Sequence, residues 1–178
     1  MGRLADGTLF APKYLENKLK FSPFVKEAVC VGDGRPYVVA LLNIDLAAAG
    51  NWAERHNLAY GSYADLAQKP EIYDLVRHEV NRVNRSLVEA GELAGAQIRK
   101  FLLLHKELDA DDQEMTRTRK VRRGFVAAKY APLIAGLYSG VDHVNVEAQV
   151  TYEDGRVGMM RADVRIAEAE VVGAGTAR

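Results

Sequence analysis

Two apolar runs lie almost next to each other near the start of the chain, at residues 25–31 and 37–44. Each run has the length of a buried strand and is bounded by turn residues. The five residues between them, Gly32-Asp33-Gly34-Arg35-Pro36, are of the types that favour tight turns. We therefore expect two neighbouring buried strands joined by a glycine-rich turn.

Helical patterns surround these runs. Residues 12–19 predict a short helix that begins at Pro12, because proline is well tolerated in the first helical turn. Residues 51–58 and 70–90 predict two further helices. In the second of these, apolar residues recur with helical spacing and form one stripe: Ile72, Leu75, Val76, Val80, Val83 and Leu87.

The second half of the chain begins with a predicted strand over 98–104. A charged loop then leads to a helix expected near 119–131, which Pro132 restarts or kinks. Thr118 is a plausible N-cap for that helix, since a threonine side chain can accept a hydrogen bond from the first free backbone N–H groups.

The last predicted element is a β-hairpin over residues 144–166. Apolar and polar residues alternate along 144–152 and along 160–166, with a turn of Glu153-Asp154-Gly155-Arg156 between them. Residues 167–178 are expected to form a flexible tail. Together the patterns predict an α+β fold, in which a small mixed sheet is flanked by helices and followed by the C-terminal hairpin.

Composition narrows the functional classes. The 178 residues include 24 lysines and arginines and 24 aspartates and glutamates, and this balance argues against a dedicated nucleic-acid binder. Cys30 is the single cysteine, which excludes an intramolecular disulfide and fits a reducing compartment, most simply the cytoplasm. No apolar run approaches the roughly 20 residues that cross a bilayer, so at most a peripheral membrane association is expected.

Several common site patterns fail in context. Gly32-Asp33-Gly34 is followed by a strand, whereas a dinucleotide fingerprint needs a helix there. The acidic segment 107–114 continues without the glycine and glutamate of a calcium loop, so a solvated acidic loop is expected. The four histidines show no ligand spacing, and Cys30 lies in an apolar strand as a buried, inert thiol. No metal site is predicted.

One charged segment is unusual. Residues 116–123 hold five cations and no acid, whereas residues 107–114 hold five acids and no base. A basic first helical turn is unfavourable, because helix N-termini favour negative charge. The segment therefore indicates either an anion site at the helix start or a solvated basic face partly neutralised by the acidic loop, and on chemistry alone the two are equally supported.

Two separated motifs resemble one family. Gly7-Thr8-Leu9-Phe10-Ala11-Pro12-Lys13-Tyr14-Leu15-Glu16 resembles the hairpin that opens the small C-terminal subdomain of adenylate-forming enzymes, such as acyl-CoA synthetases, peptide-synthetase adenylation domains and firefly luciferase. Thr116-Arg117-Thr118-Arg119-Lys120 resembles the loop that carries the catalytic lysine of that subdomain. The segments 19–24, 63–67 and 101–107 look closest to the bacterial long-chain fatty-acid–CoA ligases, and the similarity covers most of residues 5 to 166.

The sequence also departs from the family. Much of the family has a proline upstream of the lysine and a glycine immediately before it, near the places where Glu114 and Arg119 stand here. Residues 45–95 resemble a helical insertion that many relatives lack. The resemblance implies that residues 1–178 are one C-terminal subdomain of a larger ligase, with an opening hairpin at 1–12 and with the N-terminal domain of the same enzyme as its missing partner.

The resemblance also implies a mechanism. In the family, a fatty carboxylate attacks the α-phosphate of MgATP to give an acyl-adenylate, and the thiol of coenzyme A then displaces AMP. Lys120 would stabilise the charge of the first step, and the hairpin at Gly7, Thr8 and Leu9 would line the coenzyme A channel in the second. Four arginines are possible phosphate contacts: Arg117, Arg119, Arg122 and Arg123. ATP with Mg²⁺ and coenzyme A would act in the full enzyme, with no tightly bound cofactor on this chain, which alone would be inactive.

A rival interpretation is a stand-alone anion-binding or protein-interaction module without catalytic activity. The neutral charge balance and the lack of aromatic residues among the cations weigh against nucleic acid as its ligand.

Overall fold

Helices and strands both form in a computed structural model that describes residues 1–91, 94–151 and 154–173. The predicted α+β class is confirmed. The elements are β1 (Gly2–Arg3), β2 (Leu9–Phe10), α1 (Pro12–Lys20), β3 (Val25–Val31), β4 (Val38–Ile44), α2 (Leu46–Arg55), α3 (Tyr63–Ala67), α4 (Pro70–Ala90), the 3₁₀ turn η1 (Ala94–Ala96), β5 (Ile98–Leu103), α5 (Arg123–Lys129), α6 (Ala131–Tyr138), β6 (His143–Thr151) and β7 (Val157–Glu168).

The main sheet has five strands in the order β3-β4-β5-β7-β6. β4 and β5 run parallel, and the other neighbours are antiparallel, so the sheet is mixed as expected. β3 and β4 pair across the turn at Gly32–Pro36, which confirms the predicted neighbouring strands. β1 and β2 form a separate two-stranded hairpin.

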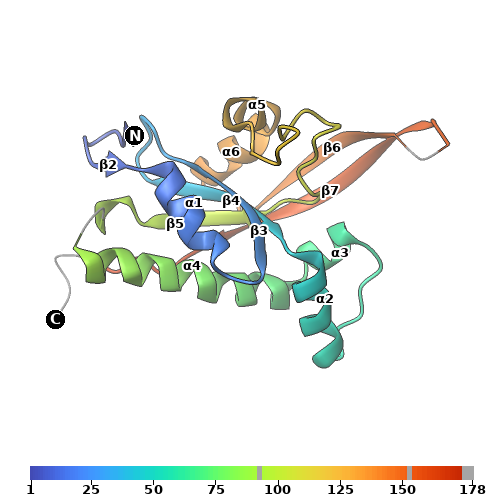
Figure 1. Cartoon of the computed structure of the whole chain (residues 1–178), viewed down its shortest axis with the longest axis horizontal. Coiled ribbons are helices and arrows are strands. Elements are labelled where there is room, and N and C mark those ends of the chain that lie inside the picture. The colour runs from blue at the N-terminus through green and yellow to red at the C-terminus, as the bar shows by residue number, and fades with distance from the viewer. Residues whose placement is uncertain (92–93, 152–153, 174–178) are drawn as a thin grey trace.

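Helices cover both faces of this sheet (Figure 1). On one face α1 and α4 pack against residues such as Ala28, Ala40 and Leu42. On the other face α5 and α6 pack against Leu41 and Leu102, among others. β4 is buried along its whole length, because its alternate side chains point into two different cores.

The segment 45–95, expected as a helical insertion, contributes α2, α3 and α4. The predicted stripe of α4 faces the sheet, and five of its residues are fully buried: Ile72, Val76, Val80, Val83 and Leu87. α2 begins at Leu46, earlier than the predicted Asn51, because Asp45 caps it by accepting a hydrogen bond of 3.0 Å from the Ala48 N–H. The segment therefore supplies one wall of the main core.

The C-terminal hairpin forms as predicted, but its second strand is longer than expected. β7 continues to Glu168 and pairs with β5 through Leu102 opposite Ile166 and Phe101 opposite Ala167. The N–H of Glu170 then donates to Asn81, and the N–H of Val172 donates to Gln97. The expected tail is thus wrong for residues 167–173, which are held by side chains from distant segments. Residues 152–153 of the predicted turn, and 174–178, lie outside the described residues.

The hairpin extends away from the rest of the molecule in Figure 1. No helix in the described part of the chain is both long and apolar enough to cross a membrane.

Candidate functional site

The helix expected near residue 119 begins later. α5 starts at Arg123 with Arg122 as its N-cap residue, so the prediction of Thr118 as an N-cap is wrong. Met115 and Val121 form an antiparallel bridge, and the residues between them make a tight loop. The cations at 117–120 therefore lie on this loop, which we call the lysine loop (residues 116–121), and not in the first turn of a helix.

Thr116 fixes the backbone of Lys120 from both sides. Its N–H donates to the Lys120 carbonyl at 2.8 Å, and its Oγ1 accepts from the Lys120 N–H at 3.1 Å. Arg119 has a positive φ of 62°, a conformation that glycine adopts at much lower cost than arginine. The geometry thus gives a physical reason for the glycine that much of the family has immediately before its lysine.

The base of the lysine loop is held by a buried carboxylate. Glu114 is 0% exposed and accepts hydrogen bonds from the Asp109 N–H at 3.0 Å, from the ammonium groups of Lys106 and Lys129, and from the Tyr130 hydroxyl. Its carbonyl accepts from the Arg122 N–H at 2.8 Å. The expected solvated acidic loop is therefore wrong at Glu114.

Protonation of this carboxylate follows from its partners. Burial alone would raise the pKa of Glu114, but the hydrogen bonds from Lys106, Tyr130 and Lys129 outweigh it and hold the pKa below the ordinary value. The carboxylate is charged at neutral pH. Together with the bond to Arg122, it joins the segment before the lysine loop to the start of α5.

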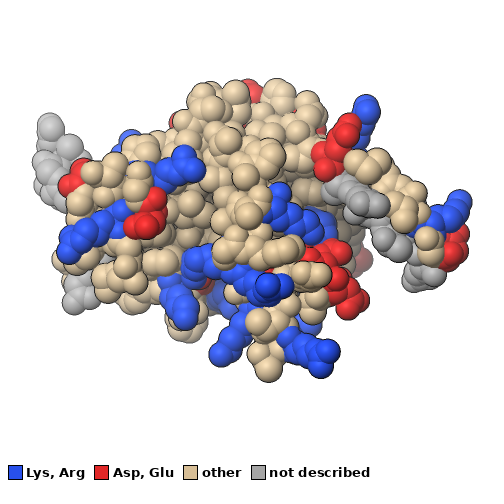
Figure 2. All heavy atoms as spheres, turned by 90° about the horizontal axis from the view of Figure 1, so that it is seen from above, with Lys and Arg blue, Asp and Glu red and all other residues tan. Residues whose placement is uncertain are grey.

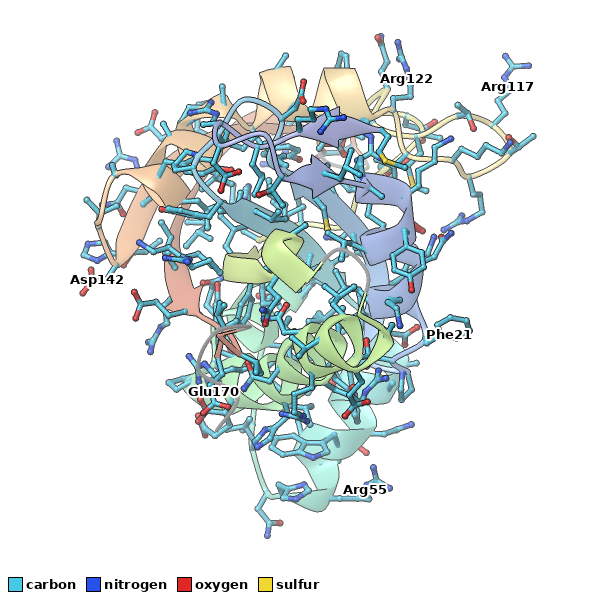
Figure 3. The ribbon with its side chains drawn as sticks, turned by 90° about the vertical axis from the view of Figure 1, so that its left-hand side faces the viewer. Phe21, Arg55, Arg117, Arg122, Asp142 and Glu170 are labelled. Carbon is cyan, nitrogen blue, oxygen red and sulfur yellow. The ribbon has the colours of Figure 1, made fainter. Side chains whose placement is uncertain are left out.

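The four arginines proposed as phosphate contacts have different surroundings. Among the described residues, the side chains of Arg117 and Arg119 have no hydrogen-bond or ion-pair partner, and Arg117 projects at the outer end of the loop (Figure 3). Arg122 donates to the Gln113 carbonyl at 3.0 Å and lies over the Phe125 ring. Arg123 makes a bidentate ion pair with Glu16, which ties α5 to α1.

Lys120 is exposed, and within the described part of the chain its ammonium group also has no partner. It lines a cleft of about 260 Å³ between the lysine loop, α1 and β3. Figure 2, seen from the α5–α6 side, shows lysine and arginine side chains gathered along one edge, with acidic side chains beside them. The lysine is thus a free cation on a fixed backbone.

The opening hairpin turns at Gly7, whose φ is 90°. The Leu4 N–H donates to the Thr8 carbonyl at 2.9 Å, and Arg3 Nη1 donates to the Gly7 carbonyl at 2.9 Å. Leu9 is 43% exposed. In the described residues Gly7, Thr8 and Leu9 do not line the cleft of Lys120, so the structure does not bring the two predicted site segments together.

His105 was not singled out by the sequence. It is buried, and neither ring nitrogen has a hydrogen-bond partner among the residues that the structure describes. Burial lowers the pKa of this histidine, so it is neutral at pH 7.

Cys30 is buried, as predicted. Within residues 1–91, 94–151 and 154–173, no group of three or more histidine, cysteine or acidic side chains could hold a metal ion.

Comparison with known proteins identifies relatives over most of the chain. The family model described as the AMP-binding enzyme C-terminal domain matches residues 3–142. The long-chain-fatty-acid–CoA ligase FadD15 of Mycobacterium tuberculosis is 35% identical over 136 residues, and a putative fatty-acid–CoA ligase of the same species, FadD11, is 33% identical over 136 residues. These matches cover 76% of this chain but only 22% and 23% of the relatives, so the chain spans about a fifth of their length.

Two solved structures share the fold. The didomain of a carboxylic acid reductase from Segniliparus rugosus, in complex with AMP, has a TM-score of 0.59 and 18% identity, covering 77% of this chain and 17% of that one. The adenylation domain of a carboxylate reductase from Mycobacterium chelonae has a TM-score of 0.58 and 20% identity, covering 77% of this chain and 19% of that one.

The match to the family model includes residues 45–95 and ends before β6, whereas the resemblance was expected to continue to residue 166.

Proposed function

Because the chain belongs to the family of AMP-binding enzyme C-terminal domains, we propose that it is the mobile C-terminal subdomain of a long-chain fatty-acid–CoA ligase. In this role it supplies Lys120 to the adenylation step and then the hairpin at Gly7, Thr8 and Leu9 to the coenzyme A channel. The identity to two mycobacterial fatty-acid–CoA ligases, one of them named a long-chain ligase, supports the substrate class.

The proposal rests on one observation, the local environment of Lys120. Thr116 pins its backbone, and its ammonium group has no partner in the described residues. Adenylation concentrates negative charge where the fatty carboxylate meets the α-phosphate of ATP. A cation held in advance near that point stabilises the transition state without transferring a proton.

The remaining groups would come from elsewhere in the enzyme. The N-terminal domain is the proposed partner, and it would bind the adenine and the acyl chain. Mg²⁺ would arrive bound to ATP. The buried free thiol of Cys30 fits the cytoplasm as the proposed location.

The hairpin suits a narrow channel because its turn has little bulk. Nothing in the described structure lies within 4 Å of the position of a Cβ on Gly7, so that turn has open space on its side-chain face. In the proposed second step the subdomain rotates, Lys120 withdraws, and this turn lies against the pantetheine arm of coenzyme A. A glycine lets the backbone approach such a ligand closely.

The test separates the two half-reactions in the full-length ligase. We expect Lys120→Ala to slow acyl-adenylate formation about 10²- to 10³-fold, measured by pyrophosphate release. Thioester formation from supplied acyl-adenylate should stay within about twofold, because a free lysine that has moved away no longer contributes to that step. The unfolding free energy should change by less than about 0.5 kcal/mol, since the side chain is exposed.

Lys26→Ala is a matched control. Lys26 is a similarly exposed lysine on β3 that does not line the cleft, so both half-reactions should keep their rates. The 178-residue chain alone provides the blank and should form no acyl-CoA. The proposal is wrong if Lys120→Ala leaves adenylation intact, or if it slows both half-reactions equally.

A further inference from the structure

The cleft beside Lys120 carries more charge than the lysine loop alone supplies. Five cations line it, three from the loop and the start of α5 and two from α1, against two carboxylates: Arg119, Lys120, Arg123, Lys13 and Lys20 against Glu16 and Glu27. For a chain with no net charge overall, this is a strong local excess of positive charge.

Both carboxylates already have cationic partners. Glu16 is occupied by the bidentate ion pair with Arg123 and also accepts from the Cys30 N–H at 2.8 Å. Glu27 pairs with Lys20 at 3.5 Å. Lys13, Arg119 and Lys120 therefore remain as three cations that share one cleft and have no partner among the described residues.

We propose that this cleft binds a group of two or more linked phosphates, and that Lys13 and Arg119 complete the binding site around Lys120. Three unpaired cations from two separate elements match the several negative charges of such a group. A volume of about 260 Å³ is below the roughly 300–1,000 Å³ that holds a whole drug-sized ligand, so the cleft suits the phosphates and not an entire nucleotide.

Both ATP and coenzyme A contain linked phosphates, and either can be the source. The inference rests on the proposed function only for this choice of source. It adds Lys13, which lies on α1 and not on the lysine loop. Arg117 and Arg122 lie outside the cleft and take no part in the site.

The experiment titrates the isotope-labelled 178-residue chain by NMR at low salt with sodium tripolyphosphate, ATP, coenzyme A and AMP. We expect tripolyphosphate to shift the backbone amides of α1, β3 and the lysine loop, and AMP, with one phosphate, to bind at least about tenfold more weakly. Rising salt should weaken binding, because the cleft is open to solvent. Amide shifts with ATP but not with coenzyme A would identify ATP as the source of the bound phosphates, and shifts with coenzyme A alone would identify coenzyme A. Shifts with both ligands would show that they share the site.

Matched variants locate the site. Lys13→Ala and Arg119→Ala should each weaken tripolyphosphate binding about three- to tenfold. Arg55→Ala should leave binding unchanged, because Arg55 lies on α2, far from the lysine loop in Figure 3. The same spectra show whether each variant is folded.

Two results would overturn the inference that the cleft binds linked phosphates. The first is that tripolyphosphate shifts no amides of the cleft, and the second is that Arg55→Ala weakens binding as much as Lys13→Ala does. Such a result would leave the role of Lys120 untouched, because that role is read from half-reaction rates in the full-length ligase. Conversely, phosphate binding here with no effect of Lys120→Ala on adenylation would refute the proposed function alone.

Discussion

Replacing Glu114 by glutamine would keep the shape of the side chain and remove its charge. In the native protein the carboxylate accepts from two lysines, one tyrosine and the Asp109 N–H. The amide of glutamine can accept only at its one oxygen, and its NH₂ group meets a lysine that is also a donor. Removing one member of a buried ion pair costs about 3–5 kcal/mol.

The lower end of that range applies here. The side chains of Lys106 and Lys129 are 21% and 35% exposed, so both can regain water when the carboxylate is lost. We therefore expect Glu114→Gln to lower the unfolding free energy by about 3 kcal/mol, which corresponds to a fall in Tm of roughly 6–12 °C for a domain of this size. Urea unfolding followed by circular dichroism measures the difference.

The pH dependence has a defined sign. The folded pKa of Glu114 lies below its ordinary value of 4.5, so the carboxylate stabilises the fold above that pH, and this contribution is lost as the pH falls through the folded pKa. The difference in unfolding free energy between the native chain and the variant should thus be constant above about pH 5 and shrink in more acidic solution.

Glu107→Gln is the control, because Glu107 is 42% exposed and pairs only loosely with Lys26. This substitution should cost less than about 0.5 kcal/mol. A loss below about 1 kcal/mol for Glu114→Gln, or a gap that widens in acid, would refute the reasoning.

Two other substitutions test the hairpin and the main core. Gly7→Ala places a side chain at a φ of 90°, where it meets no other atom of the described structure but strains the backbone, so it should cost about 1–2 kcal/mol in urea unfolding. In the proposed full-length ligase, Gly7→Val should slow thioester formation and spare adenylation, and equal slowing of both would point to misfolding. Leu87→Ala should cost about 2–5 kcal/mol, because Leu87 is fully buried on α4; a loss under about 1 kcal/mol would mean that α4 packs loosely on the sheet.

Sequence patterns predict the regular parts of this fold well. The valine-rich runs of β3 and β4 and the stripe of α4 are decided by local periodicity, which the sequence displays directly. The start of α2 was missed because the apolar residues of β4 continue into Leu46 and its alanines, so the cap at Asp45 was not recognised. Boundaries that depend on one capping residue are hard to read from periodicity.

The site was predicted in part, for a related reason. The motif at Thr116–Lys120 was found by resemblance. Its loop conformation, however, depends on the bridge between Met115 and Val121. A bridge between two single residues leaves no pattern in the sequence from which it could be predicted. The burial of Glu114 depends on partners from two other places in the chain, Lys106 and the adjacent residues Lys129 and Tyr130. These contacts cannot be predicted from local propensity or residue spacing, because tertiary packing determines which distant side chains meet.

The position of β7 between β5 and β6 has a consequence for how the chain is made. Leu102 pairs with Ile166, 64 positions further along. At about 5–20 residues per second, a ribosome needs roughly 3 to 13 seconds to deliver the second partner after the first. During that interval one edge of β5 is unpaired, although its own residues Phe101, Leu102 and Leu103 are all buried in the folded protein. Such an edge is a template for pairing with other chains, so the nascent domain is most exposed to aggregation, and most in need of a chaperone, just before its last strand emerges.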